Sequence, residues 1–73
     1  MITYFGEMWL NFDNEDERER TTEMLRTNGF TVRNFNGETC VDFARRSLGD
    51  MQDLFEVITA AEGGVSSLRM LHE

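Results

Sequence analysis

The stretch from Phe30 to Phe43, FTVRNFNGETCVDF, decides the fold because it encodes a complete hairpin. Asn36-Gly37 is a favoured two-residue turn between antiparallel strands, since both residues tolerate a positive φ. A turn there places Val32 opposite Val41 and brings the two end residues of the stretch together on the same face. The small and polar residues fall on the other face: Thr31, Arg33, Cys40 and Asp42.

Residues 1–12 precede the hairpin and alternate in polarity, which predicts a strand. One parity is apolar and faces the core, whereas Phe5, Glu7 and Trp9 take the other. Gly6 could mark a bulge or a turn that splits the segment. We expect one long strand.

A helix is predicted between this strand and the hairpin, from about Asn14 to Asn28. Asp13 and Asn14 offer N-cap oxygens, and acidic residues crowd the first turn, where the helix dipole favours negative charge. Asn28-Gly29 can adopt the left-handed conformation that ends a helix. The inward stripe expected from helical spacing is Thr21, Met24, Leu25 and Asn28.

A second helix follows the hairpin, with Ser47 as N-cap and Asp50 completing a capping box. Gly63-Gly64 is expected to stop it, and residues 65–71 read as a short strand of ambiguous parity. The apolar residues of this helix recur at helical spacing: Leu48, Met51, Leu54, Phe55, Ile58 and Ala61.

The predicted order is strand, helix, strand, strand, helix, strand. This order fits an α+β, ferredoxin-like βαββαβ fold, with one four-stranded antiparallel sheet and both helices on one face. Right-handed crossovers put the first and third strands in the middle of the sheet. The expected core lies between the helices and the sheet: Leu25, Leu54, Phe55 and Ile58 against Ile2, Tyr4, Leu10, Val32, Val41 and Phe43.

Length and charge narrow the class of function. The 73 residues suffice for a single domain, 1–73, and carry a net charge of −7, with no Lys and seven Arg. Excess negative charge repels phosphate backbones and favours a basic partner, so direct nucleic-acid binding is disfavoured. No apolar run is long enough for a membrane span, and a soluble, intracellular, cytoplasmic protein is expected.

The sheet face opposite the helices is the first candidate site. Phe5 and Trp9 lie there by parity, with Phe35 beside them, and aromatic anchors on an uncovered sheet are typical of protein interfaces. Alternatively, a loop, the C-terminal tail or a second copy of the chain covers them. RNA-recognition domains also carry aromatic residues on this face, but residues 38–44 lack their basic start and hold two carboxylates.

An acidic surface on the first helix is the second candidate. It could meet a basic groove, or it could be a solvated helix face braced by ion pairs: Arg20 with Asp16 and Glu17, and Arg26 with Glu23. Its members, predicted as partner-binding residues, are Asp13, Glu15, Asp16, Glu17, Glu19 and Glu23.

Catalytic and metal sites are not expected. His72 is the only histidine and is expected to be mobile next to the end of the chain, so no Cys-His or Ser-His pair is expected to be held in place. Cys40 is the only cysteine, and a zinc site would need His72 with scattered carboxylates. We expect a non-enzymatic protein without a cofactor.

Two functions follow as expectations. The first is a small acidic regulator or inhibitor that docks on a basic, nucleic-acid-handling protein. In size and charge the chain is similar to the acidic inhibitors that phages direct against host RNA polymerase or CRISPR effector complexes, and its acidic helix could act by nucleic-acid mimicry. The alternative is a ligand-sensing or homodimerising module that pairs through its open sheet face, so the chain is expected to be a monomer or a homodimer.

Overall fold

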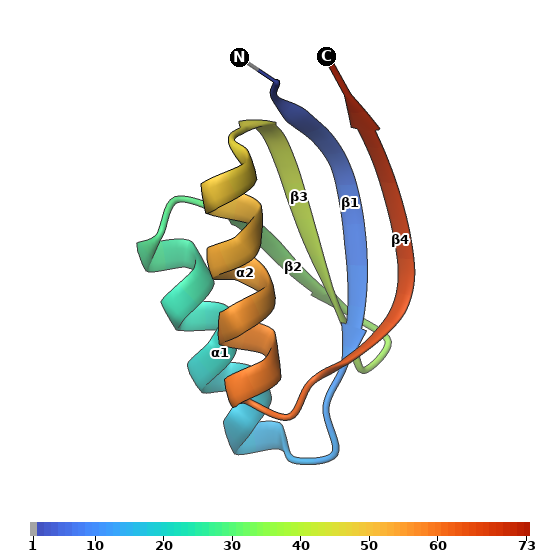
Figure 1. Ribbon diagram of the computed structural model, residues 1–73. Helices are drawn as coiled ribbons and strands as arrows, with labels where there is room; N and C mark the ends of the chain where they lie inside the picture. The colour runs from blue at the N-terminus through green and yellow to red at the C-terminus, as the bar shows by residue number, and fades with distance from the viewer. Residues whose placement is uncertain (1) are drawn as a thin grey trace.

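The computed structural model describes residues 2–73 and confirms the ferredoxin-like α+β fold. The four strands form an antiparallel sheet in the order β2-β3-β1-β4, so the first and third strands are central. Both helices pack on one face (Figure 1). Met1, predicted to open the first strand, lies outside the described residues. The elements are β1 (Tyr4–Asn11), α1 (Glu15–Thr27), β2 (Thr31–Phe35), β3 (Glu38–Arg46), α2 (Leu48–Ala60) and β4 (Gly64–His72).

The β2-β3 hairpin has the predicted register. Val32 pairs with Val41, and Arg33 pairs with Cys40. The turn at Asn36-Gly37 has φ values of 51° and 80°, as the expected tight turn requires. Because the turn is this short, it leaves no freedom for β2 to slip along β3.

The helix starts follow the predicted capping. The Asn14 side chain accepts hydrogen bonds from the backbone N–H groups of Asp16 and Glu17, at 2.8 and 3.4 Å. At α2, the Ser47 hydroxyl accepts from the Asp50 N–H, and the Asp50 carboxylate accepts from the Ser47 N–H. These bonds satisfy backbone donors that the helices leave free.

The end of α2 differs from the expectation. Glu62, not a glycine, takes the left-handed conformation, with a φ of 56°. Gly63 has a different role, because a Cβ there would lie 2.7 Å from the Phe12 ring. The glycine pair therefore allows close packing against the end of β1 rather than supplying the turn. The first helix does end as predicted, with Gly29 at a φ of 85°.

The core between helices and sheet is largely as predicted, with Met8, Leu10, Leu25, Val41 and Leu54 fully buried. Five residues expected on inward faces are exposed instead: Ile2 by 55%, Met24 by 50%, Leu48 by 56% and Phe55 by 39%, together with Asn28. Ile2 precedes the first residue of β1, and Thr21 and Thr22 fill the inward face of α1 in place of Met24.

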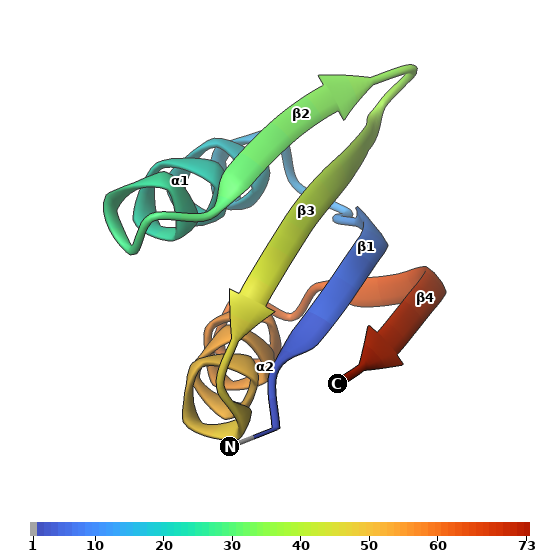
Figure 2. The same ribbon diagram turned by 90° about the horizontal axis from the view of Figure 1, so that it is seen from above.

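β4 explains why Phe55 is exposed. It forms the edge of the sheet beyond β1, farthest from α1 (Figure 2). It has nine residues, so it is not the short strand expected, and every one of them is exposed. Its pairing resolves the ambiguous parity, because Leu68 and Met70 lie beside Met8 and Gly6 on the helix side. The flank of α2 towards this edge consequently has no full cover.

Two irregularities adjust the central pairings. The β1-β3 register shifts between Tyr4 and Gly6, where Arg45 on β3 has a φ of 56°. The β1-β4 register shifts after Trp9, so that Ser66 becomes an extra residue on β4. Each bulge adds one residue to one strand and lets the alternation on β1 continue. Gly6 thus marks a bulge within a single strand, one of the alternatives that the sequence leaves open.

Gly6 offers a sharp test of the sheet. A Cβ at Gly6 would collide with the backbone carbonyl of Arg69 on β4, so the strands must separate to admit a side chain. We expect Gly6→Ala to lower the free energy of unfolding by about 3 kcal/mol, at the upper end for overpacking. Urea denaturation followed by Trp fluorescence measures the change.

Gly49→Ala is the matched control. Gly49 lies in the first turn of α2, and a Cβ there would meet no atom closer than the Ser47 hydroxyl at 3.7 Å. Alanine should stabilise this site by about 0.5 kcal/mol, because it lowers the entropy of the unfolded chain and favours the helix. Equal effects of the two substitutions would contradict the close β1-β4 approach.

Candidate functional site

The sheet face opposite the helices carries the aromatic residues expected there. Met8 and Leu10 of β1 are fully buried on the helix side, so Phe5 and Trp9 point to the opposite face. Both are half-buried within the described chain. In Figure 1 this face, on the right of the sheet, has no helix over it.

Trp9 lies in an open hollow at the β2-β3 turn end of this face. The hollow has a volume of about 510 Å³. Its aromatic walls are Trp9 and Phe35, and 64% of Phe35 is exposed. We call it the aromatic hollow, and its lining residues are Trp9, Phe35, Asn36, Glu38, Ser66 and Ser67.

Phe5 does not belong to the aromatic hollow. It is four residues from Trp9 along β1, a separation of about 13 Å, with Glu7 between them on the same face. Its neighbour on β4 is Leu71, which is 69% exposed. The two predicted aromatic anchors therefore share a face without forming one site.

The bulge on β4 brings polar groups to the aromatic hollow. Ser66 is the extra residue, and its hydroxyl donates to the Glu38 carboxylate at 2.9 Å. The same hydroxyl lies 3.1 Å from the backbone carbonyl of Trp9. Ser66 thereby connects β4 to β3 across β1 and fixes the position of the Glu38 side chain.

A cluster of polar groups around Arg33 occupies the centre of the face. Arg33 donates to both carboxylate oxygens of Asp42, at 3.0 and 3.4 Å, and to the Cys40 sulfur at 3.4 Å. The hydrogen bonds and charge of Asp42 raise the pKa of Arg33, which keeps the guanidinium charged. Asp42 is thus neutralised within the protein and is a weaker attraction for a partner than Glu38.

Cys40 lies under this cluster and is fully buried. Burial raises the pKa of the Cys40 thiol, the nearby Asp42 charge adds to this, and Arg33 opposes it. A buried thiol with a raised pKa is a poor nucleophile.

Three possible metal ligands lie close together on this face. The side-chain donor atoms of Glu7, Cys40 and Asp42 are within 4.8 Å of one another, so the carboxylates near the cysteine are not scattered. The Arg33 guanidinium already contacts two of the three groups, and its positive charge takes the place that a metal ion would have. The cluster is accounted for as an internal ion-pair network.

His72 is held in β4, contrary to the expectation of a mobile position. It pairs with Tyr4, and the two rings are 6.3 Å apart. Cys40 pairs with Trp9, five residues further along β1, so the histidine and the cysteine are about 16 Å apart along the strand. The structure does not bring them together.

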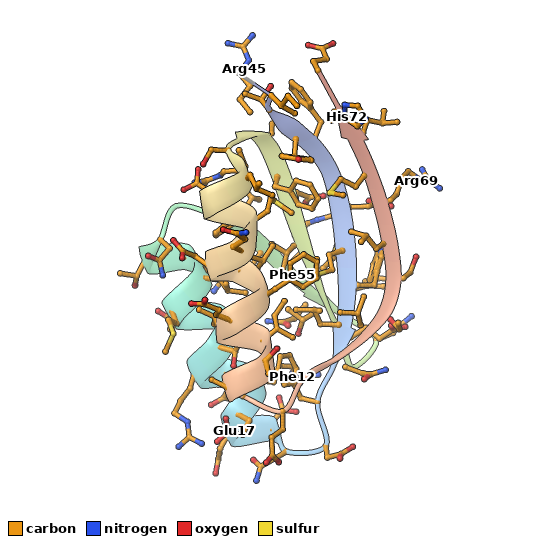
Figure 3. All side chains as sticks on the ribbon, in the orientation of Figure 1. Phe12, Glu17, Arg45, Phe55, Arg69 and His72 are labelled. Carbon is orange, nitrogen blue, oxygen red and sulfur yellow. The ribbon has the colours of Figure 1, made fainter. Side chains whose placement is uncertain are left out.

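The acidic surface of α1 lies on the other side of the molecule from the open face, and Glu17 stands at its lower end in Figure 3. The predicted ion pairs of Arg20 with Glu17 and of Arg26 with Glu23 are present, and Arg18 pairs with Glu15. The expected pair of Asp16 with Arg20 is not among the ion pairs of residues 2–73. The exposed acids outside these pairs are Asp13, Asp16 and Glu19.

Sequence reasoning placed Phe35 on the open face but did not select it as a site residue. Asn36, Glu38 and the two serines were missed entirely. Asn36 is the first turn residue and Glu38 follows the turn, so the hairpin register contains the signal that could have found them. The serines carry no such signal, because only the bulge on β4 turns both towards the aromatic hollow.

Comparison of the chain with protein families, with curated proteins and with solved structures finds no match in any of the three. Among residues 2–73, neither helix is both long and apolar enough to cross a membrane.

The buried thiol makes stability depend on pH. The folded protein holds the Cys40 proton more tightly than the unfolded chain, so this contribution is complete below the ordinary thiol pKa of 9.0 and is lost above it. We expect the free energy of unfolding to fall as the pH rises past 9, by at most about 1.4 kcal/mol per pH unit.

Urea denaturation with a reducing agent, at intervals from neutral pH to above pH 9, measures this slope. Cys40→Ala should flatten it relative to the unmodified protein, whatever its effect on absolute stability. Identical slopes for the two proteins would show that Cys40 does not hold its proton as described.

Proposed function

We propose that the protein is a non-enzymatic binding module that docks through its open sheet face on a basic protein that handles nucleic acid. The observation that carries this proposal is the aromatic hollow: Trp9 and Phe35 stand partly exposed on a sheet face that no helix covers. Aromatic side chains at the centre of a surface supply most of the binding energy in many protein interfaces.

The charge of the chain selects the kind of partner. A net charge of −7 speeds association with a basic surface and opposes contact with acidic ones. The exposed acids Asp13, Asp16 and Glu19 on and before α1 strengthen this field, although they lie away from the aromatic hollow. We assign them to long-range attraction and the open face to contact.

A regulatory or inhibitory action follows from this chemistry. Basic surfaces on nucleic-acid-handling proteins bind phosphate backbones, so an acidic protein seated on such a surface competes with the nucleic acid. Such competition is the type of activity proposed for this chain by its similarity in size and charge to the phage inhibitors of host RNA polymerase or of CRISPR effectors.

Affinity capture with immobilised protein tests the proposal. At low salt we expect the protein to retain a nucleic-acid-binding protein, and at about 0.5 M salt to release it, because screening weakens exposed charge pairs. Trp9→Ala should weaken binding of the captured partner by about 2 kcal/mol, roughly thirtyfold, as expected for an aromatic anchor.

A double variant, Asp16→Asn with Glu19→Gln, separates the two surfaces. It removes two unpaired charges from α1 and should slow association at low salt with little effect on dissociation. Dependence of dissociation on this variant, with none on Trp9→Ala, would place the contact on α1 and reject the open face.

Homodimerisation remains the second candidate, and β4 favours it. This strand is an edge with nine exposed residues, including Leu68 and Met70 on the helix side and Leu71 on the open side. Residues 63–72 contain no acid, so two copies could pair there with little charge repulsion. Edge-to-edge pairing is the usual hazard of such a strand.

Sedimentation velocity tests this candidate at protein concentrations up to roughly 1 mM, where weak pairing is detectable. A dimer should dissociate on Leu68→Glu, because two added charges would meet across the edge. Leu48→Glu, at an exposed leucine of α2, should leave it intact. A monomer over the whole range eliminates the candidate.

A further inference from the structure

We propose that the aromatic hollow receives an arginine side chain of the partner. This inference rests on the proposed function and names the group that the open face recognises. The hollow combines two aromatic rings, one carboxylate and several oxygen acceptors, and its lining contains no basic residue. A guanidinium group is the protein side chain that uses all of these features.

The aromatic walls favour a flat cation. Trp9 offers the ring with the strongest attraction for a cation, and Phe35 offers a second, largely exposed ring. A planar guanidinium can stack on such rings, whereas the compact and strongly hydrated ammonium group of lysine stacks less well. The walls therefore favour arginine over lysine.

The polar residues supply acceptors for the guanidinium N–H groups. Glu38 is the only carboxylate of the lining, and one of its oxygens accepts the Ser66 hydroxyl at 2.9 Å. A carboxylate accepts about four hydrogen bonds, so Glu38 keeps capacity for a guanidinium. The bond from Ser66 holds this carboxylate in place before a ligand arrives.

The arginines of the open face do not fill the hollow. Arg33 is bound to Asp42 and Cys40 at the centre of the sheet. Arg69 stands opposite Glu7 in the β1-β4 ladder, further along β1 from Trp9. Its side chain points away from the helices in Figure 3. The charge of Glu38 is thus left for a partner.

The same recognition already occurs within this chain. The Arg46 guanidinium lies 4.2 Å from the centre of the Phe30 ring and also donates to the backbone carbonyl of Gly29. An aromatic face with an oxygen acceptor beside it therefore holds an arginine elsewhere in this protein. The aromatic hollow presents two rings and a charged acceptor.

Trp9 is the only tryptophan, so its fluorescence reports directly on the hollow. The test titrates the protein with the peptide acetyl-Gly-Arg-Gly-amide and with its lysine and citrulline counterparts. One exposed side chain binds weakly, so peptide concentrations reach roughly 10 mM or more. We expect a saturable change with arginine, an affinity several times weaker with lysine, and no saturation with neutral citrulline.

Two substitutions that change the net charge by the same amount make the test specific. Glu38→Gln should weaken arginine binding about threefold to fivefold, because it removes the charged acceptor. Glu56→Gln, on an exposed position of α2 on the opposite side of the sheet, changes the net charge equally and should leave binding unaltered. Circular dichroism of both variants confirms that the fold is retained.

Several results would overturn the inference: no saturable change with arginine, an equal response to citrulline or lysine, or no loss on Glu38→Gln. A shift of Trp9 emission with protein concentration alone would show that a second copy fills the hollow, which also overturns it. If the peptide fails but partner capture keeps its salt dependence and its need for Trp9, the arginine inference falls and the proposed function stands.

Discussion

The structure depends on the register that the Asn36-Gly37 turn imposes on β2 and β3. A two-residue turn permits one pairing, and that pairing buries Val32 and Val41 while it leaves Arg33 beside Cys40 on the other face. β3 lies beside β1 in the middle of the sheet. Because the two strands are hydrogen-bonded in a fixed register, residues opposite one another on them face the same side. A slip of β2 by one residue would turn its core residues to the open face.

Local signals in the sequence were sufficient for the parts of the fold that depend on neighbouring residues. The hairpin, the caps at Asn14 and Ser47, and the strand order all follow from spacing and turn chemistry. Features set by distant segments were not predictable: Phe55 is exposed because of where β4 lies, and Ser66 reaches Glu38 only through a bulge. Only part of the candidate site could therefore be predicted from the sequence. The strand alternation places its aromatic walls, whereas its polar lining depends on how distant strands pair.

The distribution of charge divides the surface into regions with different physical roles. Several carboxylates of α1 are paired with arginines one helical turn away, and such exposed pairs contribute little to stability. On the open face, Asp42 is engaged by Arg33, whereas Glu38 is held only by a neutral hydroxyl. Net charge acts over a Debye length, but contact chemistry depends on which individual carboxylate still lacks a cation.

The buried position of Cys40 has a consequence for dynamics. The thiol is covered on the β2 side by the Arg33 guanidinium and lies between two paired strands. A reagent can reach the sulfur only while local motion of Arg33 or of β2 uncovers it, and such openings occur far more often than global unfolding. The rate of thiol labelling under native conditions therefore measures how often the open face around Arg33 loosens while the rest of the protein stays folded.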